Sequence, residues 1–207
     1  MRRQGSKRGL ILVISGPSGS GKTTLLKNVI LDKPAGRKFA KSISVTTRPR
    51  RSGERDGRDY FFVSREEFRR LVKSKKILEW TRYLGYYYGT KKEFLEEKLK
   101  AGRHLALCLD LNGARALKRL YPQDTVTVFI EAPSISELRK RIRGRCNKTR
   151  QEEINKRIKL AKAELNNFRH YDYTLKNKNL AQAASRLKDI ISGEIRRREE
   201  PDFDYAG

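Results

Sequence analysis

Cysteine is scarce in this sequence of 207 residues, which contains only two, and no apolar run is long enough to cross a membrane. Cys108 and Cys146 lie far apart without the spacing of a metal site, which favours a reducing compartment. The run from Leu10 to Ile14 is too short to span a bilayer, and no signal peptide is visible. We therefore expect a cytoplasmic protein that has no membrane partner.

Acidic residues are also few, because 24 aspartates and glutamates accompany 49 lysines and arginines, giving a formal net charge of +25. Such a charge attracts polyanions, so nucleic acid is one possible partner. The basic residues are spread along the whole chain, however, and no zinc-finger, RNP or KH signature accompanies them. We favour a solvated basic surface suited to an acidic substrate, for which nucleic acid is not required.

A glycine-rich stretch near the N-terminus fits the pattern G-x-x-x-x-G-K-[ST] at every required position. An apolar, β-branched run precedes it and a helical pattern follows it, which is the context that a phosphate-binding loop needs. Glycines let backbone N–H groups point at the phosphates, and the helix adds the positive end of its dipole. The predicted ATP-binding residues are Gly16, Pro17, Ser18, Gly19, Ser20, Gly21, Lys22 and Thr23. Lys22 supplies a cation for the β- and γ-phosphates, and the Thr23 hydroxyl can ligate Mg²⁺.

Strand patterns alternate with helix patterns along the rest of the chain. Strands are expected at 10–14, 42–45, 59–63, 77–84, 86–88, 104–110, 125–130 and 174–175. Helices are expected at 24–31, behind the capping box at Ser64, and at 91–100, 112–120, 135–145, 150–169 and 180–195. The helices at 135–145 and 150–169 are expected to begin at two more capping boxes, at Ser134 and Thr149. We expect a flexible arm at 1–8 and a flexible tail at 196–207. The alternation predicts an α/β fold, in three layers around a central parallel sheet, with ligands at the carboxyl ends of its strands.

A second motif lies in the polar stretch from Ser42 to Phe62, which reads S-x-S-x-T-T-R-x-x-R-x-G-E-x-x-G-x-D-Y-x-F. Glu79-Trp80 and Tyr87-Tyr88-Gly89-Thr90 follow it in order. Together with the phosphate loop, these elements resemble the nucleotide-binding signature of guanylate kinases, from residue 9 to about residue 195. The resemblance implies transfer of the ATP γ-phosphoryl group to GMP, with Mg²⁺, by a monomer or homodimer. It also implies a small mixed acceptor-binding lobe near 42–97 and a helical lid near 143–157.

The residue types of the second motif suit GMP. Arg48 and Arg51 could clamp one phosphate with charge-assisted bonds, and Tyr60 and Tyr88 offer phenol donors to the same group. Guanine presents N1–H and N2–H₂ as adjacent donors that one carboxylate accepts side by side, which makes Glu79 the candidate base reader. Ser44 and Thr90 are predicted to complete the GMP site.

Other candidates concern the metal and the transferring group. Asp110 ends a predicted apolar strand, where a carboxylate can hold Mg²⁺ or its water shell, and it is also assigned to the GMP site. Arg141 and Arg145 lie four residues apart, hence on one helix face, and Arg157 lies on the next predicted helix. The resemblance places these three arginines in the lid, where, with Lys22, they would stabilise the charge of the transferring phosphoryl group.

The chain departs from the family pattern at a few positions. Cys108 stands where the family usually has an aspartate two residues before Asp110, and Cys146 stands where a lid glycine is common. The late N-D-D element reads Asn177-Lys178-Asn179. One alternative is a guanylate-kinase-like binding module without catalysis, but the intact phosphate loop argues against it. Another is a kinase of a sugar phosphate such as ribose 1,5-bisphosphate, which would need no guanine-reading residue.

Overall fold

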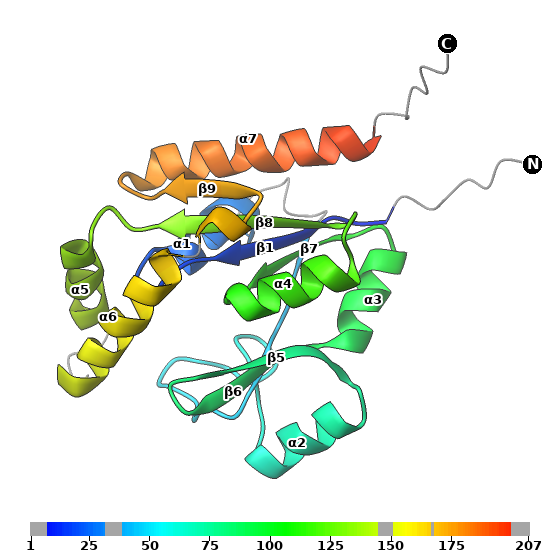
Figure 1. Ribbon diagram of the computed structural model, residues 1–207. Helices are drawn as coiled ribbons and strands as arrows, with labels where there is room; N and C mark the ends of the chain where they lie inside the picture. Colours follow the sequence, from blue (N-terminus) through cyan, green and yellow to red (C-terminus); the bar gives the residue numbers. More distant parts are fainter. Residues whose placement is uncertain (1–7, 32–38, 145–150, 167, 200–207) are drawn as a thin grey trace, which may run out of the picture.

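The computed structural model describes residues 8–31, 39–144, 151–166 and 168–199. Its larger sheet has five strands in the order β2-β7-β1-β8-β9, and every neighbouring pair is parallel (Figure 1). The strands are β1 (Ile11–Ser15), β2 (Phe39–Lys41), β7 (His104–Cys108), β8 (Thr125–Glu131) and β9 (Tyr173–Lys176). The prediction of an α/β fold around a central parallel sheet is confirmed.

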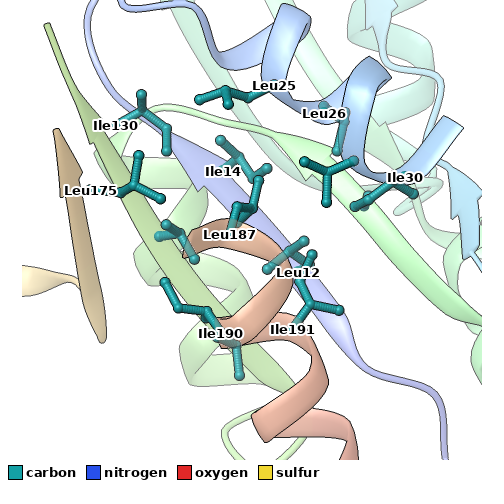
Figure 2. Close-up of a cluster of buried hydrophobic side chains, with 14 of the residues drawn as sticks. Leu12, Ile14, Leu25, Leu26, Ile30, Ile130, Leu175, Leu187, Ile190 and Ile191 are labelled. Carbon is teal, nitrogen blue, oxygen red and sulfur yellow. The ribbon is translucent and has the colours of Figure 1, made fainter. Parts of the chain in front are cut away.

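The alternation of side chains along β1 builds both faces of this sheet, because successive residues of a strand point to opposite sides. Leu12 and Ile14 pack against α1 (Lys22–Leu26), the π-helical turn Lys27–Leu31 and α7 (Leu180–Glu199), as Figure 2 shows. Ile11 and Val13 pack on the other face, against α3 (Lys92–Lys100) and α4 (Leu111–Leu120). The three layers fix the carboxyl end of β1, from which the phosphate loop emerges.

A second, mixed sheet carries the acceptor motif, in the strand order β4-β3-β6-β5. Its elements are β3 (Val45–Thr46), β4 (Phe61–Phe62), α2 (Arg65–Lys73), β5 (Ile77–Tyr83) and β6 (Tyr86–Lys91). Its own small core forms around Phe68, Val45 and Ile77. Leu84 and Gly85 form the tight turn between β5 and β6 with φ angles of 50° and 86°, as a two-residue hairpin loop requires.

Two helices on the other side of the phosphate loop make up a separate cluster. They are α5 (Ile135–Gly144) and α6 (Gln151–Leu165), packed together through Leu138, Ile142, Ile154 and Ile158. The capping boxes at Ser64 and Ser134 are confirmed, because each hydroxyl accepts a hydrogen bond from the amide three residues later, at 3.0 and 3.1 Å. The predicted capping box at Thr149 lies outside the described residues.

Several predicted boundaries are wrong. The strand expected at 42–45 is wrong except at Val45: residues 42–44 connect β2 to β3, and the strand in this region is β2, because Phe39 and Ala40 pair with β7, a long-range contact that the local pattern does not reveal. The helix expected at 150–169 ends at Leu165. Helix α7 continues to Glu199 instead of ending at 195, and ion pairs from Arg197 and Arg198 to Glu194 support its last turn. No helix in the described ranges is long and apolar enough to cross a membrane.

Candidate active site

The phosphate loop depends on glycine at three positions. Gly16, Gly19 and Gly21 have φ angles of 134°, 88° and 94°, which disfavour residues with a side chain. A Cβ at Gly16 would also lie 2.2 Å from the Ile130 carbonyl oxygen of β8. The loop therefore keeps its backbone close to the sheet. Lys22 folds back over it and donates hydrogen bonds to the Gly16 carbonyl and, at 2.9 Å, to the Pro17 carbonyl.

Asn177 supports the same loop from behind. It is buried, and its side-chain Nδ2 donates to the Ser20 carbonyl oxygen at 2.8 Å. Its backbone N–H donates to the backbone carbonyl oxygen of Glu131 at 2.8 Å. A Cβ at Gly21 would lie 2.3 Å from that Nδ2 atom. The first residue of the Asn177-Lys178-Asn179 element thus ties β9 to the phosphate loop, a role that the sequence did not indicate.

A cavity of about 440 Å³ opens between the phosphate loop, the ends of β1 and β7, and the inner face of the mixed sheet. It brings together both motifs, although they are separated in the sequence. The predicted site residues that line it are Gly16, Ser18, Lys22, Thr23, Ser44, Arg51, Tyr60, Glu79, Tyr88 and Asp110. The residues predicted to bind the donor phosphates and those predicted to bind the acceptor therefore line one cavity.

Glu79 is the most buried carboxylate of this cavity, with 6% of its surface exposed. The Thr90 hydroxyl donates to its Oε1 atom at 2.6 Å. Burial raises the pKa of Glu79 to about 7, the Thr90 hydrogen bond opposes that rise, and the negative charge of Asp110 adds to it. The absence of a side chain at Gly113 leaves room for the Oε2 atom of Glu79, because a Cβ at residue 113 would lie only 2.8 Å from that oxygen. The carboxylate is thus held in place by a hydroxyl that was itself predicted to contact the base.

The arginine loop is organised by Glu54. Arg48, only 8% exposed, donates through Nη2 to Glu54 Oε1 at 2.7 Å, and the Arg51 amide donates to Oε2 at 2.8 Å. Burial opposes ionisation of Glu54, but the hydrogen bonds from Arg48 and Arg51 outweigh it and lower the pKa of the carboxyl group. The Arg48 guanidinium also lies over the rings of Tyr60 and Phe62, 5.3 and 5.7 Å from their centroids.

A further cavity, of about 980 Å³, separates this arginine loop from α6. Arg48, Arg51 and Tyr88 line one side, and Arg157 lines the other. Arg157 donates to the Ser18 hydroxyl at 3.3 Å and pairs with Glu153 at 2.6 Å. An arginine of the predicted lid therefore already contacts the phosphate loop.

Comparison with known proteins now decides the family. A sequence model of the guanylate kinase family matches residues 8–194. This chain belongs to the guanylate kinase family. It is 42% identical over 194 residues to a guanylate kinase of Bacillus anthracis, covering 94% of this chain and 93% of that protein. It is 40% identical over 193 residues to a guanylate kinase of Bacillus subtilis, covering 93% of each.

A solved structure agrees with these relatives. The crystal structure of guanylate kinase from Anaplasma phagocytophilum superposes with a TM-score of 0.73 at 34% sequence identity, covering 90% of this chain and 86% of that one. Because the match covers nine tenths of this chain, the fold is that of a guanylate kinase.

Three predicted residues of this guanylate kinase family member, Arg141, Arg145 and Asp110, need separate comment. Arg141 pairs with Glu137 on its own helix, Nε to Oε1 at 2.8 Å, and lines neither cavity. Arg145 lies outside the described residues. Asp110 lies beyond the end of β7, not within it, and its Oδ1 caps α4 by accepting a hydrogen bond from the Gly113 amide at 2.9 Å.

The metal candidates suit Mg²⁺ in their chemistry, because Thr23 and Asp110 both line the cavity and offer oxygen ligands. Within the described ranges, no group of three or more His, Cys, Asp or Glu residues could hold a metal by itself. Such a pair of oxygen donors fits a metal that arrives with nucleotide phosphates, which is how Mg²⁺ is usually held in kinase sites.

Two further residues of the cleft were not predicted from the sequence. Tyr83, at the end of β5, lines both cavities. Glu164 of α6 lines the smaller one, and burial raises its pKa to about 7, although Lys22 opposes the shift. Neither residue belongs to a recognisable motif, so no sequence signal could have identified them. Glu54, in contrast, belongs to the acceptor motif, although no role for it followed from the sequence.

Proposed function

We propose that this chain is an ATP:GMP phosphotransferase that converts ATP and GMP into ADP and GDP. The observation that carries the proposal is the buried carboxylate of Glu79, which accepts a hydrogen bond from Thr90 and lines the same cavity as the phosphate loop. A carboxylate fixed at this place can accept the N1–H and N2–H₂ donors of guanine together. Adenine lacks that pair of donors, so binding it would leave a buried carboxylate unmatched, which is strongly unfavourable.

The two substrates occupy the cleft from opposite sides. The loop amides and Lys22 hold the β- and γ-phosphates of ATP, and Arg48, Arg51, Tyr60 and Tyr88 hold the phosphate of GMP. A GMP phosphate oxygen then forms a bond to the γ-phosphorus while the bond from that phosphorus to the β–γ bridging oxygen breaks. ADP leaves with that electron pair. No covalent enzyme intermediate is needed, because positioning and charge stabilisation suffice.

Cations complete this mechanism. Arg157, which lies at Ser18, can reach the equatorial oxygens of the transferring group, and Arg141 and Arg145 are proposed to join it when the helices α5 and α6 move inward. Mg²⁺, when bound with ATP near Thr23 and Asp110, neutralises phosphate charge. The proposal includes a cytoplasmic location, since its substrates are soluble nucleotides.

Closure of the acceptor lobe (42–97) and the lid (143–157) is part of the proposal, because water at the γ-phosphate would otherwise compete with GMP. The open cavity of about 980 Å³ between the arginine loop and α6 leaves space for such a movement. Solution scattering with GMP and a non-hydrolysable ATP analogue should show a smaller radius of gyration than the free protein. An unchanged radius would contradict closure.

The decisive experiment is an ADP-formation assay with Mg²⁺ and GMP, AMP, UMP, CMP or ribose 1,5-bisphosphate in turn. We expect turnover with GMP and less than 1% of that rate with the other acceptors. A Lys22→Met variant is the matched negative control for the donor side. Turnover with the sugar phosphate instead of GMP, or ATP binding without turnover of any acceptor, would overturn the proposal in favour of a sugar-phosphate kinase or a non-catalytic binding module.

A further inference from the structure

The carboxyl group of Glu164, near the end of α6, has one oxygen that is buried without a hydrogen-bond partner. Glu164 is partly exposed and lines the cavity of about 440 Å³. Its Oε2 atom is covered from solvent, and within the described part of the chain no group donates a hydrogen bond to it. Buried acceptors without a partner are costly and rare. The carboxylate can turn about its terminal bond, so this oxygen is a candidate acceptor for a ligand in the cavity.

The neighbours of Glu164 in this cavity belong to the ATP side of the site. Lys22, Thr23 and Asp110 line the same cavity. The positive charge of Lys22 favours an ionised carboxylate at Glu164, whereas the negative charge of Asp110 opposes it. Glu164 thus shares the cavity with Thr23 and Asp110, the two residues whose oxygens suit Mg²⁺.

Helix α6 presents Glu164 and Arg157 on one side. The two residues lie seven positions apart, which is about two turns, so they occupy the same face at a separation of about 10 Å along the axis. Between them, Ile158 and Ala161 are buried in the cluster that joins α6 to α5, and this packing fixes the rotation of α6 about its axis. Arg157 donates to the Ser18 hydroxyl at 3.3 Å. One helix therefore brings a cation to the phosphate loop and an anion to the cavity beside it.

A hydrated metal ion would supply the donor that the Glu164 oxygen lacks. Mg²⁺ in kinase sites usually keeps several of its waters, and these waters can donate hydrogen bonds to protein oxygens. Among the described residues, no group of three or more His, Cys, Asp or Glu could hold a metal directly, so contact through water suits this site better than direct ligation.

We propose that Glu164 is a positioning residue that accepts hydrogen bonds from the water shell of the Mg²⁺ that arrives with ATP. The inference rests on the proposed kinase activity, and it adds a residue that neither the phosphate-loop motif nor the acceptor motif contains. An oxygen that lacks a partner in the free protein gains one in the complex, so the contact adds to the affinity for the metal-bound nucleotide and not to that for the nucleotide alone.

The test compares wild type with Glu164→Gln, which keeps the shape of the side chain and removes its charge. Titration calorimetry measures Kd for a non-hydrolysable ATP analogue with Mg²⁺ and, separately, with EDTA. With Mg²⁺ the variant should bind about 5- to 10-fold more weakly, because a charge-assisted hydrogen bond becomes a neutral one. With EDTA its Kd should stay equal or decrease, because a negative charge that repels the phosphates is gone.

Glu93→Gln is the matched control, because it removes the same charge at an exposed position of α3 outside both cavities. Its two Kd values should stay within about twofold of wild type. Chemical denaturation adds a second measurement. Glu164→Gln should unfold at the same denaturant concentration as wild type or at a higher one, because it replaces an unpaired buried carboxylate by a neutral group.

Two results would overturn the inference. An unchanged Kd with Mg²⁺ would show that the metal-bound nucleotide makes no use of this carboxylate. Equal weakening with Mg²⁺ and with EDTA would show that Glu164 acts through Lys22 or through the fold instead of the metal. Neither measurement involves GMP, so absence of GMP turnover in the wild-type protein is a separate result, which refutes the proposed function itself.

Discussion

Glu54 binds Arg48 and the backbone of Arg51 at the same time, with one carboxylate oxygen for each, at 2.7 and 2.8 Å. The pair with Arg48 is largely buried, so solvent screens it little. Two hydrogen bonds to one carboxylate therefore fix the guanidinium of Arg48 and the loop geometry of Arg51, the two residues proposed to bind the GMP phosphate. Preorganisation of this kind lowers the ordering cost that binding would otherwise include.

Replacing Glu54 by Gln should weaken GMP binding without removing the phosphate-binding cations. We expect KM for GMP to rise about tenfold, because a charge-assisted hydrogen bond is worth about 1.5–3 kcal/mol, while kcat changes less than about threefold. Steady-state kinetics at saturating ATP measure both constants. Glu93→Gln, an exposed position on α3, is the control. Equal KM values for Glu54→Gln and wild type would show that the arginine loop needs no such support.

GMP affinity should depend on pH through Glu79. Guanine donates to the ionised carboxylate, whereas the pKa of about 7 means that a proton competes with guanine below that pH. The affinity should therefore be greatest above pH 8 and fall, by up to about tenfold per pH unit, as the pH decreases below 7. Calorimetry between pH 5.5 and 8.5 measures this, and below pH 7 binding should release a proton.

Glu79→Gln is the control for this pH profile. The GMP phosphate also titrates, with a second pKa near 6, and that contribution is present in both proteins. The variant should bind GMP more weakly at pH 8 and show only the phosphate contribution. If the two pH profiles run parallel, the proton that competes with GMP is not on Glu79.

The sequence predicts those parts of the site that depend on contacts between residues close together in the chain, and it fails where the contacts are long-range. The phosphate loop is local: its glycines, the preceding strand and the following helix lie within about twenty consecutive residues, and the structure has them as expected. Residues 42–45, in contrast, show an alternating pattern that indicated one strand. Pairing of Phe39 with His104 of β7 moves the strand three residues earlier, and no local pattern specifies that partner.

The residues of the site that the sequence did not predict also depend on long-range packing. Tyr83 on β5 and Glu164 on α6 line one cavity although they lie about 80 residues apart in the sequence. Asp110 was expected at the end of a strand because its apolar run continues to Leu109. It instead begins α4, since its side chain satisfies the Gly113 amide. Tertiary packing, rather than sequence pattern, decides these roles.

Asn177→Ala should weaken ATP binding selectively. The substitution leaves the buried Ser20 carbonyl without its 2.8 Å partner and removes the amide group that fills the space at Gly21. We expect a loss of about 1–3 kcal/mol in the free energy of unfolding and a roughly tenfold higher Kd for ATP, with Kd for GMP nearly unchanged. Calorimetry and chemical denaturation measure these, with Asn112→Ala, exposed on α4, as the control. An equal weakening of GMP binding would indicate a general loss of structure.

Cys108 should report occupancy of the cleft. It lines the cavity near Lys22 and Lys41, and its surroundings raise the pKa of the thiol, chiefly by desolvation, although both lysines oppose the shift. Because the thiolate is the reactive form, alkylation by iodoacetamide should be slow at pH 7 and accelerate about tenfold per pH unit up to pH 9. GMP together with an ATP analogue should slow the alkylation at least fivefold, and the alkylated protein should lose GMP turnover, because the adduct occupies the cavity.

Peptide mapping by mass spectrometry follows the modification at Cys108, and Cys108→Ser should keep its turnover after the same treatment. Alkylation that nucleotides do not slow, or that leaves turnover intact, would mean that substrates do not reach this end of the cavity.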